Sequence, residues 1–244
     1  MEMRPIRAAA VLETGHACLG CAVRLLAICG VLGSEELRDF KASGATVKRD
    51  AGETIFFESD PATHVYNLTS GVLRLSKLLP DGRRQIAGFL FPGDFLGITM
   101  EDEHAFTAEA ITPSTLCQFS RARFDGFVDA HPHLERRLYA IAAHELAAAR
   151  QQVVLLGRKT AAERVASFLL MLDARRISSG RGEKLDGFIT LPMSRSDIAD
   201  YLGLRIETIS RELSALKASC VIRLTTTQTI RFVDRERLEQ LAEG

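Results

Sequence analysis

Three cysteines lie close together near the start of the chain. Cys18, Cys21 and Cys29 form a C-x2-C-x7-C pattern, and a fourth cysteine, Cys117, follows much later. Four thiolates from one short segment and one distant strand are a sufficient ligand set for an iron–sulfur cluster or a metal ion. We expect the fifth cysteine, Cys220, to take no part in this site.

Other interpretations of these cysteines remain open. A four-cysteine zinc site or another redox-sensing site would use the same thiolates, although zinc sites more often contain two C-x-x-C pairs and this chain has one. Cysteines also serve as small core residues. An odd number of cysteines, five in all, and no export signal argue against a disulfide framework. We therefore predict a cytoplasmic protein with thiolate ligands.

A second set of residues has the spacing of a helix-turn-helix. Ser194-Arg-Ser-Asp197 is a capping box that opens one helix, and Gly203 ends it. Ala199 supplies the small residue that closely crossing helices need. A second helix follows, with Ile206, Ile209 and Leu213 expected to face inward.

The outer face of that second helix carries candidate DNA-reading residues: Glu207, Thr208, Ser210 and Arg211. An arginine can donate two hydrogen bonds to guanine, and a glutamate can accept one from cytosine. The alternative is a solvated face on which Glu207 and Arg211 form an ordinary i,i+4 ion pair. We favour DNA contact. DNA phosphates repel a carboxylate, so a glutamate on a DNA-facing surface indicates that it binds a base.

The elements that position these residues are of three kinds. Residues 45–119 contain short apolar runs separated by turn signals such as Asp81-Gly82, which predicts a β-sandwich, a β-roll or a β-barrel. A short helix, Glu35–Lys41 with Ser34 as N-cap, precedes it. A helix capped by Ser120 follows it.

A long helix is predicted from Leu134 to Leu156. Its apolar residues are spaced three and four apart, which is typical of a dimerisation seam. The seam consists of Tyr139, Ala142, Leu146, Ala149, Val153 and Leu156. We expect Leu138, Ile141 and Leu155 to pack inside their own chain.

The predicted fold class is α+β. After the second helix, Val221–Leu224 and Thr229–Phe232 predict a two-stranded wing whose Thr and Arg side chains meet DNA phosphates. The domain organisation that we expect is a cysteine-rich cluster-binding segment (1–33), a β-domain that acts as the sensor (34–130), a dimerisation helix (131–158) and a winged helix-turn-helix domain (159–244).

Composition narrows the function. The chain has 244 residues with 31 basic and 31 acidic side chains, so DNA contact has to come from local arrangement. No apolar run reaches the ~18 residues of a membrane span, and we expect no membrane partner. Neither a nucleophile elbow nor a phosphate loop is present, and we predict a protein that is not an enzyme.

The chain resembles the CRP/FNR family of bacterial regulators, and more narrowly its oxygen-sensing FNR branch. The resemblance rests on the glycines of the β-region (Gly52, Gly71 and the run Phe91–Gly97), on the seam helix, and on Ile206–Arg211, which is similar to the E-x-x-S-R sequence of that branch. The C-x2-C-x7-C spacing is similar to the variant of alphaproteobacterial relatives.

The resemblance implies that the sensor domain, residues 34–130, is a β-roll of the cyclic-nucleotide-binding type. It also implies a [4Fe-4S] cluster on Cys18, Cys21, Cys29 and Cys117. It also implies a homodimer that binds double-stranded DNA at TTGAT-N4-ATCAA-type sites and works with RNA polymerase. In oxygen, the cluster would be lost and specific DNA binding would fall. We expect the apolar residues Val23, Leu25, Leu26 and Ile28 to shield the cluster.

Two departures from the family limit what it implies. Its cyclic-nucleotide members carry a G-E-L segment and an Arg-Ser pair, where this chain has Gly97–Thr99 and Ala105–Glu109. No Arg or Lys lies between Arg84 and Arg121 to pair with a cyclic phosphate, so we predict no cyclic nucleotide. Ala149 replaces an acidic residue that hinders dimerisation in a relative, which predicts a dimer less strictly dependent on the cluster.

Overall fold

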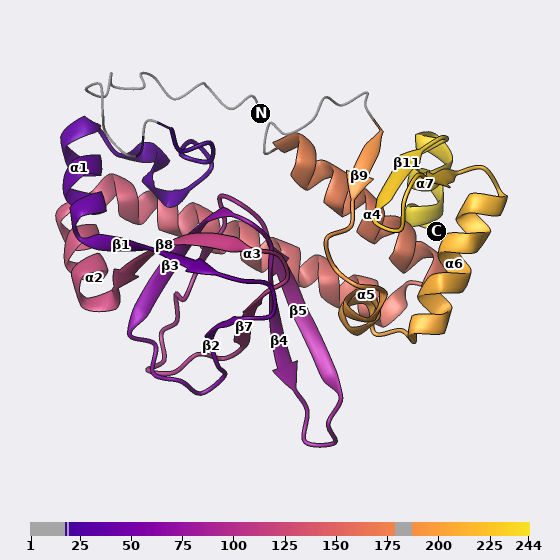
Figure 1. Ribbon diagram of the computed structural model, residues 1–244, viewed down its shortest axis with the longest axis horizontal. Helices are drawn as coiled ribbons and strands as arrows, with labels where there is room; N and C mark the ends of the chain where they lie inside the picture. Colours follow the sequence, from indigo (N-terminus) through magenta and orange to yellow (C-terminus); the bar gives the residue numbers. More distant parts are fainter. Residues whose placement is uncertain (1–17, 19, 179–186) are drawn as a thin grey trace.

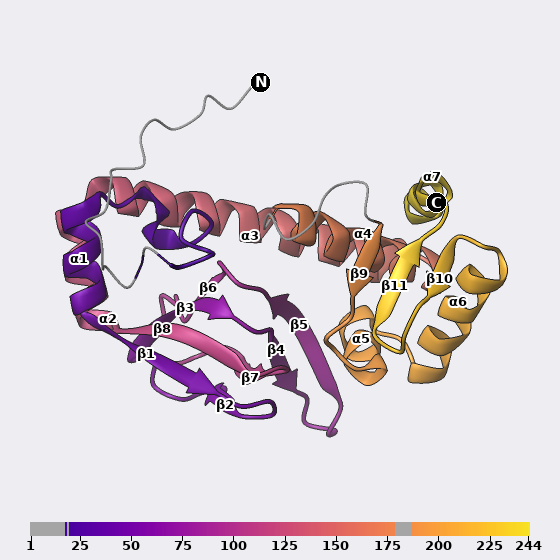
Figure 2. The same ribbon diagram turned by 45° about the horizontal axis from the view of Figure 1, so that its top comes forward.

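The computed structural model describes Cys18, residues 20–178 and residues 187–244. An N-terminal β-domain and a group of C-terminal helices lie at opposite ends of the molecule (Figure 1). The long helix α3 (Pro132–Arg158) runs along one side of the β-domain, at the top in Figure 2, and reaches the C-terminal group. Residues 1–17 and 19 of the predicted cysteine-rich segment, and residues 179–186, fall outside the described residues.

The β-domain consists of two four-stranded antiparallel sheets that face one another. One has the order β1-β8-β3-β6 and the other β2-β7-β4-β5. The strands are β1 (Gly44–Arg49), β2 (Thr54–Phe56), β3 (His64–Ser70), β4 (Leu73–Leu78), β5 (Arg84–Leu90), β6 (Phe95–Leu96), β7 (Thr107–Ala110) and β8 (Ser114–Ser120). The predicted β-roll is confirmed.

The sheets are held together by apolar side chains that alternate along their strands. Leu68, Leu73 and Leu116 are fully buried between the two sheets. The β4–β5 hairpin turns at Asp81-Gly82, as predicted from that dipeptide. Cys117 follows Leu116 directly, so its side chain points to the opposite face of β8.

Helices cover that opposite face. They are the 3-10 turn η1 (Ile28–Val31), α1 (Ser34–Ala42), α2 (Arg121–Ala130) and the first half of α3. The N-cap of α1 is Gly33 and not Ser34, because the Glu36 carboxylate accepts a hydrogen bond from Gly33 N at 2.7 Å. Ser120 occupies the N-cap position of α2, but its side chain makes no capping hydrogen bond.

Helix α3 begins two residues earlier than predicted, because Pro132 suits the first turn of a helix. Leu138 and Ile141 pack on the core of the β-domain, and Leu155 packs on the C-terminal core. The predicted inward face of this helix is therefore confirmed, although it is divided between two cores.

The C-terminal region packs its helices around one core with a small sheet at the side. Its elements are α4 (Ala161–Ser178), β9 (Phe188–Thr190), α5 (Arg195–Leu202), α6 (Ile206–Ala218), β10 (Ile222–Leu224), β11 (Thr229–Phe232) and α7 (Arg235–Glu243). The two predicted strands of the wing, β10 and β11, are paired as expected, but the prediction omitted β9, which pairs with β11 and makes a three-stranded sheet. None of the described helices is long and apolar enough to cross a membrane.

An ion-pair network joins the β-domain to α5. Arg74 of β4 and Arg84 of β5 each bond Asp197 Oδ1 at 2.8 Å, and Arg84 also pairs with Asp200 at 2.7 Å. Burial raises the pKa of Asp197, but hydrogen bonds from Ser194 and the two arginine charges outweigh burial, so this pKa lies below its ordinary value. The carboxylate that caps α5 thus also fixes α5 against the β-domain.

Candidate metal centre and nucleic-acid interface

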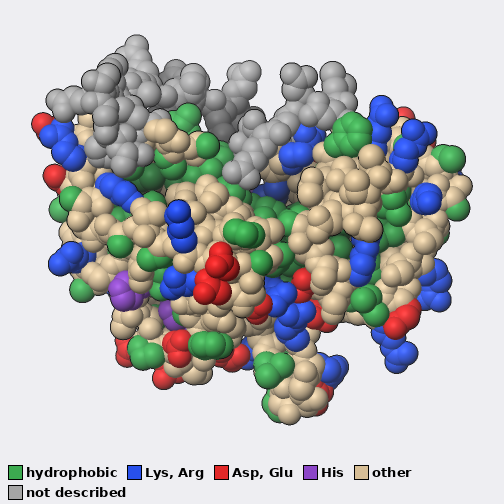
Figure 3. Space-filling model, viewed as in Figure 1, with side chains coloured by type: hydrophobic (Ala, Val, Ile, Leu, Met, Phe, Trp, Pro, Cys, Tyr) green, Lys and Arg blue, Asp and Glu red, His purple; other side chains and the backbone are tan. Residues whose placement is uncertain are grey.

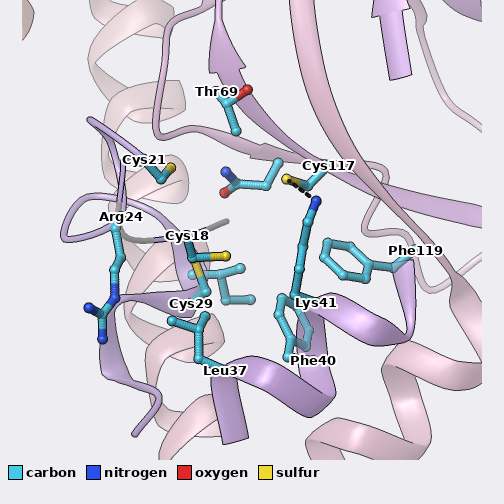
Figure 4. Close-up of a pocket in the computed structure, with 12 residues that line it drawn as sticks. Cys18, Cys21, Arg24, Cys29, Leu37, Phe40, Lys41, Thr69, Cys117 and Phe119 are labelled. Carbon is cyan, nitrogen blue, oxygen red and sulfur yellow. Dashed lines mark hydrogen bonds between the residues drawn. The ribbon is translucent and has the colours of Figure 1, made fainter. Parts of the chain in front are cut away.

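All four predicted ligand cysteines line one pocket of the β-domain. Cys18, Cys21 and Cys29 approach it from the looped N-terminal segment, and Cys117 approaches from β8 (Figure 4). The pocket also includes side chains from α1 and β3. The structure thus brings together residues that are separated by about a hundred positions in the sequence.

The N-terminal segment is held in place by contacts with its neighbours. Arg137 Nη2 of α3 donates a hydrogen bond to the carbonyl oxygen of Leu26 at 2.6 Å. Gly93 has φ +106°, and a Cβ at this position would lie 2.8 Å from that of Leu26. Only glycine leaves enough room for the cysteine segment to contact this turn so closely.

Cys117 lies in a row of three residues that runs across the sheet. Thr46 of β1 and Asn67 of β3 are its direct partners on the two flanking strands. Directly opposed residues project from the same face of a sheet. The fourth cysteine is therefore fixed by backbone pairing on both sides, whereas the other three belong to a segment of turns.

Lys41 is the charged neighbour of Cys117. It lies in the last turn of α1, and its Nζ is 3.6 Å from Cys117 Sγ and 2.8 Å from Thr46 Oγ1. The dashed line in Figure 4 marks the contact with the sulfur. An ammonium group in this position stabilises an anionic sulfur.

Asn67 supplies a buried amide with unmet hydrogen-bonding capacity. It is 3% exposed and lines the same pocket. Its Oδ1 has no hydrogen-bond partner among the described residues. Because an unpaired buried polar group is costly, the amide indicates that a further polar group belongs in this pocket.

Burial affects the protonation of two thiols in the pocket, those of Cys29 and Cys18. It raises the pKa of Cys29 to about 12, with a further contribution from the charges of Cys21, Cys18 and Cys117. Burial also raises the pKa of Cys18, which the charge of Lys41 partly offsets. A thiophilic metal group must therefore displace protons as it binds, so its affinity rises with pH.

The donor set fits a group held by four thiolates, although the structure shows no ready-made ion site. In the parts of the chain that are described, no three or more His, Cys, Asp or Glu side chains are grouped closely enough to hold a metal ion.

Of the four apolar residues that were predicted to shield the site, Val23 and Ile28 are buried and Leu26 is half-buried. Leu25 is 77% exposed, because it lies in a turn that faces outward, and its predicted shielding role is wrong.

The helix-turn-helix has the predicted geometry. Ser194 and Asp197 form the reciprocal capping box at the start of α5. Gly203 has φ +62°, a left-handed conformation that suits glycine, and Leu204 N bonds Ala199 O at 3.0 Å to complete the turn. Ile209 and Leu213 are buried as predicted, but Ile206, at the first position of α6, is 44% exposed.

The outer face of α6 is accessible to a ligand. Glu207, Ser210 and Arg211 are exposed, and Thr208 is half-buried. Arg211 Nη2 lies 3.4 Å from Thr208 Oγ1, a contact that directs the guanidinium along the first turns of the helix.

Basic side chains extend this face onto the wing. Figure 3 shows Lys and Arg side chains along the outer edge of the C-terminal region. Exposed Arg223 and Arg231 are direct partners on β10 and β11, and Arg231 also lies over the Phe188 ring at 5.3 Å. Like charges directly opposite one another destabilise a sheet, and an anion between them would relieve that cost.

The six seam residues of α3 show a common exposure pattern with one exception. Tyr139, Leu146 and Val153 are 78%, 54% and 72% exposed, and both alanines of the seam are exposed as well. Leu156 is half-buried, because it lies near Gly203 of the helix-turn-helix. Large apolar side chains exposed at helical spacing are typical of an interface with another chain.

Two residues of the pocket, Lys41 and Asn67, were not predicted from the sequence. In the sequence, Lys41 is an ordinary basic residue at the end of a predicted helix, whereas Asn67 interrupts an apolar strand. The interruption was a usable signal, because a polar residue in a buried strand needs a partner. The strand register that places it beside Cys117 was not available from the sequence.

The fold defines a class of protein. A β-domain that is linked by a long helix to a winged helix-turn-helix with a basic face is the architecture of a DNA-binding regulator. Comparison with known proteins agrees. Residues 46–131 match the cyclic nucleotide-binding domain family, and residues 163–241 match the Crp-like helix-turn-helix domain family.

Relatives of nearly full length identify the family. The chain is 47% identical over 229 residues to the nitrogen fixation regulation protein FixK of Bradyrhizobium diazoefficiens, covering 93% of this chain and 94% of that protein. It is 37% identical over 225 residues to the transcriptional activator protein FnrL of Cereibacter sphaeroides, covering 91% and 90%. It superposes on FixK2 from Bradyrhizobium japonicum with a TM-score of 0.75 at 39% identity, covering 81% and 96%. The chain belongs to the CRP/FNR family, and it is a transcription regulator and not an enzyme.

Proposed function

We propose that this regulator is an oxygen-responsive transcriptional activator whose four-cysteine pocket holds a [4Fe-4S] cluster. The observation that carries the proposal is the shared pocket, in which Cys18, Cys21 and Cys29 meet Cys117 from β8. When bound, such a cluster supplies oxygen-sensitive iron–sulfur chemistry. The chain's own part is to provide the thiolates, to shield them with Val23 and Ile28, and to link them to α3.

The link to α3 runs through the N-terminal segment. Arg137 bonds the carbonyl of Leu26, and η1 packs against the same helix. Tyr139, the first seam residue, is two positions after Arg137 on α3. A change in the shape of the cysteine segment would therefore act close to the start of the seam.

The seam makes a homodimer the functional unit of this proposal. Tyr139, Ala142, Leu146, Ala149, Val153 and Leu156 form the interface, with Leu156 at its edge. A two-fold dimer would place two α6 helices about one DNA turn apart, ~34 Å. On each, Glu207, Thr208, Ser210 and Arg211 would contact base edges of a TTGAT-N4-ATCAA-type site, with the wing on phosphates.

The domains and the partners of this regulator are the ones that we expect from the sequence. The cluster-binding segment spans 1–33, the sensor domain 34–130, the dimerisation helix 131–158 and the DNA-binding domain 159–244. RNA polymerase is the further partner, and cyclic nucleotide is not a ligand. In support of the last point, Glu109 on β7 is paired with Arg74, so that arginine is not available to a cyclic phosphate.

Anaerobic purification with iron and sulfide assays tests the cluster. We expect about four irons and four sulfides per chain, and their loss on exposure to air. Cys117→Ser should abolish stable loading, because it removes the ligand that the sheet fixes. Cys220→Ser is the matched control, since Cys220 is exposed and lies outside the pocket.

Other metals give a distinct result. Colourless protein that contains zinc but no sulfide would replace the cluster with the four-cysteine zinc site. Protein with neither metal nor sulfide would leave the cysteines as core residues and end the proposal. A footprint over the palindrome that is the same before and after air exposure would contradict oxygen control.

A further inference from the structure

The pocket contains donor groups besides its cysteines. Thr46, Cys117 and Asn67 project from the same face of three adjacent strands, β1, β8 and β3. Lys41 reaches over this row from α1 and contacts Thr46 Oγ1 at 2.8 Å and Cys117 Sγ at 3.6 Å. One side of the pocket therefore carries a cation and an amide around the single fixed cysteine.

These two groups are poorly explained by the polypeptide alone. The amide of Asn67 is 3% exposed and Oδ1 has no partner in the described structure. A half-turn of the amide exchanges oxygen and nitrogen, which are hard to distinguish, and would then direct an N–H donor to the same place. The ammonium of Lys41 lies beside a sulfur and a hydroxyl, and it forms no ion pair with a carboxylate of the described residues.

A cluster with four thiolates has the complementary chemistry. Its sulfurs accept hydrogen bonds, and the whole group carries net negative charge that a nearby cation stabilises. Hydrogen bonds to sulfur and local charge are main determinants of cluster properties. A bare apolar wall would leave that charge uncompensated in a partly buried pocket.

We infer that Lys41 and Asn67 are positioning residues for the bound cluster, with Lys41 neutralising charge at the Cys117 corner and Asn67 donating an N–H to a cluster sulfur. This inference rests on the proposed function. It adds two residues, from α1 and β3, to a site otherwise composed of cysteines. It also explains why a polar residue interrupts the apolar strand β3.

The test compares anaerobically reconstituted full-length variants. Lys41→Gln removes the charge, Lys41→Arg keeps it, and Asn67→Leu removes the amide at similar volume. Lys77→Gln is the matched control. Lys77 lies on β4 of the other sheet and does not line the pocket, and the substitution removes only its surface ion pair with Glu58. The measurements are the rate of iron transfer to a chelator without oxygen, the iron–sulfur stretching bands in resonance Raman spectra, and the melting temperature of the cluster-free protein.

We expect Lys41→Gln and Asn67→Leu to lose iron about tenfold faster than the wild type and to shift the Raman bands. Lys41→Arg should restore most of the retention, and Lys77→Gln should match the wild type. Asn67→Leu should melt at the same or a higher temperature without the cluster, since it removes an unpaired buried amide. A merely structural role for Asn67 would lower cluster-free stability and leave the bands unchanged.

The outcomes separate this inference from the proposed function. Wild-type protein that takes up no iron and sulfide overturns both. Wild-type protein that loads normally, with equal rates and bands in both charge- and amide-removing variants, overturns only the roles of Lys41 and Asn67. If Lys41→Gln does not fold, Asn67→Leu alone tests the inference. The inference then requires that this variant loses iron faster than the wild type and that its cluster-free form melts at the same or a higher temperature.

Discussion

Arg211 and Arg231 carry the same charge on neighbouring elements, but their surroundings differ. Arg211 lies on the first turns of α6 beside Thr208, where recognition helices reach base edges. Arg231 lies on β11, opposite Arg223 and over Phe188. We assign the first to bases and the second to phosphate.

This difference predicts two kinds of binding defect. Arg211→Ala should cost about 1–3 kcal/mol of binding to the palindrome and relax the preference at one base pair. Arg231→Ala should weaken binding to all sequences alike and reduce the slope of affinity against salt by about one. Titration of matched and single-mismatch DNA at several salt concentrations measures both effects. Equal losses on every sequence for both variants would exclude base recognition by Arg211.

At the scale of the element, α3 serves three surfaces at once. Leu138 and Ile141 pack on the β-domain, Leu155 packs on the C-terminal core, and the seam stays exposed. A single apolar stripe could not cover all three surfaces, because each side chain projects from only one face of a helix. Under the proposed function, a second copy of the chain would cover the exposed seam.

Two neighbouring alanines test the seam. Ala149→Asp places a carboxylate at the proposed two-fold interface, where it meets its own copy, and should weaken the cluster-free dimer at least about tenfold. Ala148→Asp adds the same charge to an exposed residue outside the seam and should leave dimerisation unchanged. Sedimentation at several protein concentrations distinguishes them. If both variants dimerise like the wild type, the interface lies elsewhere.

At the scale of the whole molecule, the contact between the β4–β5 hairpin and α5 fixes the two ends relative to one another. Asp197 has a side chain only 5% exposed and holds both Arg74 and Arg84. Removing one member of a buried ion-pair network is costly, because the remaining charges lose their partner. The cost falls on the orientation of α5 as well as on its stability.

Substitutions of two adjacent arginines, Arg84 and Arg83, distinguish the contact with α5 from an ordinary surface ion pair. Arg84→Gln should destabilise the protein by about 1–3 kcal/mol and increase hydrogen exchange in α5. Arg83→Gln breaks only a local pair with Asp81 on the exposed hairpin, where solvent screens the charges, and should leave stability close to that of the wild type. Denaturant unfolding and hydrogen exchange measure these effects, and equal behaviour of the two variants would contradict a fixed contact.

The same contact has a defined pH dependence. The folded-state pKa of Asp197 is lowered, so its stabilising contribution is complete above the ordinary carboxyl value, ~3.9, and is lost as the pH falls through the lowered pKa. The difference in stability between wild type and Arg84→Gln should therefore be constant near neutral pH and shrink only in acid.

Local patterns predicted most elements, and long-range contacts determined what was missed. The capping box at Ser194, the turn at Gly203 and the Asp81-Gly82 hairpin depend on residues a few positions apart, and all three were confirmed. Strand β9 is only three residues long and gains its identity by pairing with β11, so no periodicity revealed it.

The candidate site was predictable in its ligands but not in its surroundings. Spacing drew attention to the cysteines, because C-x2-C brings two thiols together locally. Lys41 and Asn67 join them through the packing of α1 and the register of β3 against β8, which connect residues far apart in sequence. Leu25 was misjudged because apolar character alone does not show which way a turn faces.

The hydrogen bond from Arg137 to Leu26 has a thermodynamic consequence. The segment that would hold the cluster and the helix that would form the dimer share this contact, so under the proposed function cluster binding and dimerisation would be linked equilibria. Linkage is reciprocal: if the cluster favours association, association must favour the cluster by the same factor. More concentrated protein, or protein already gathered on its DNA site, would then keep its iron longer than dilute protein. The sensitivity of such a sensor is set by its own abundance as well as by its ligands.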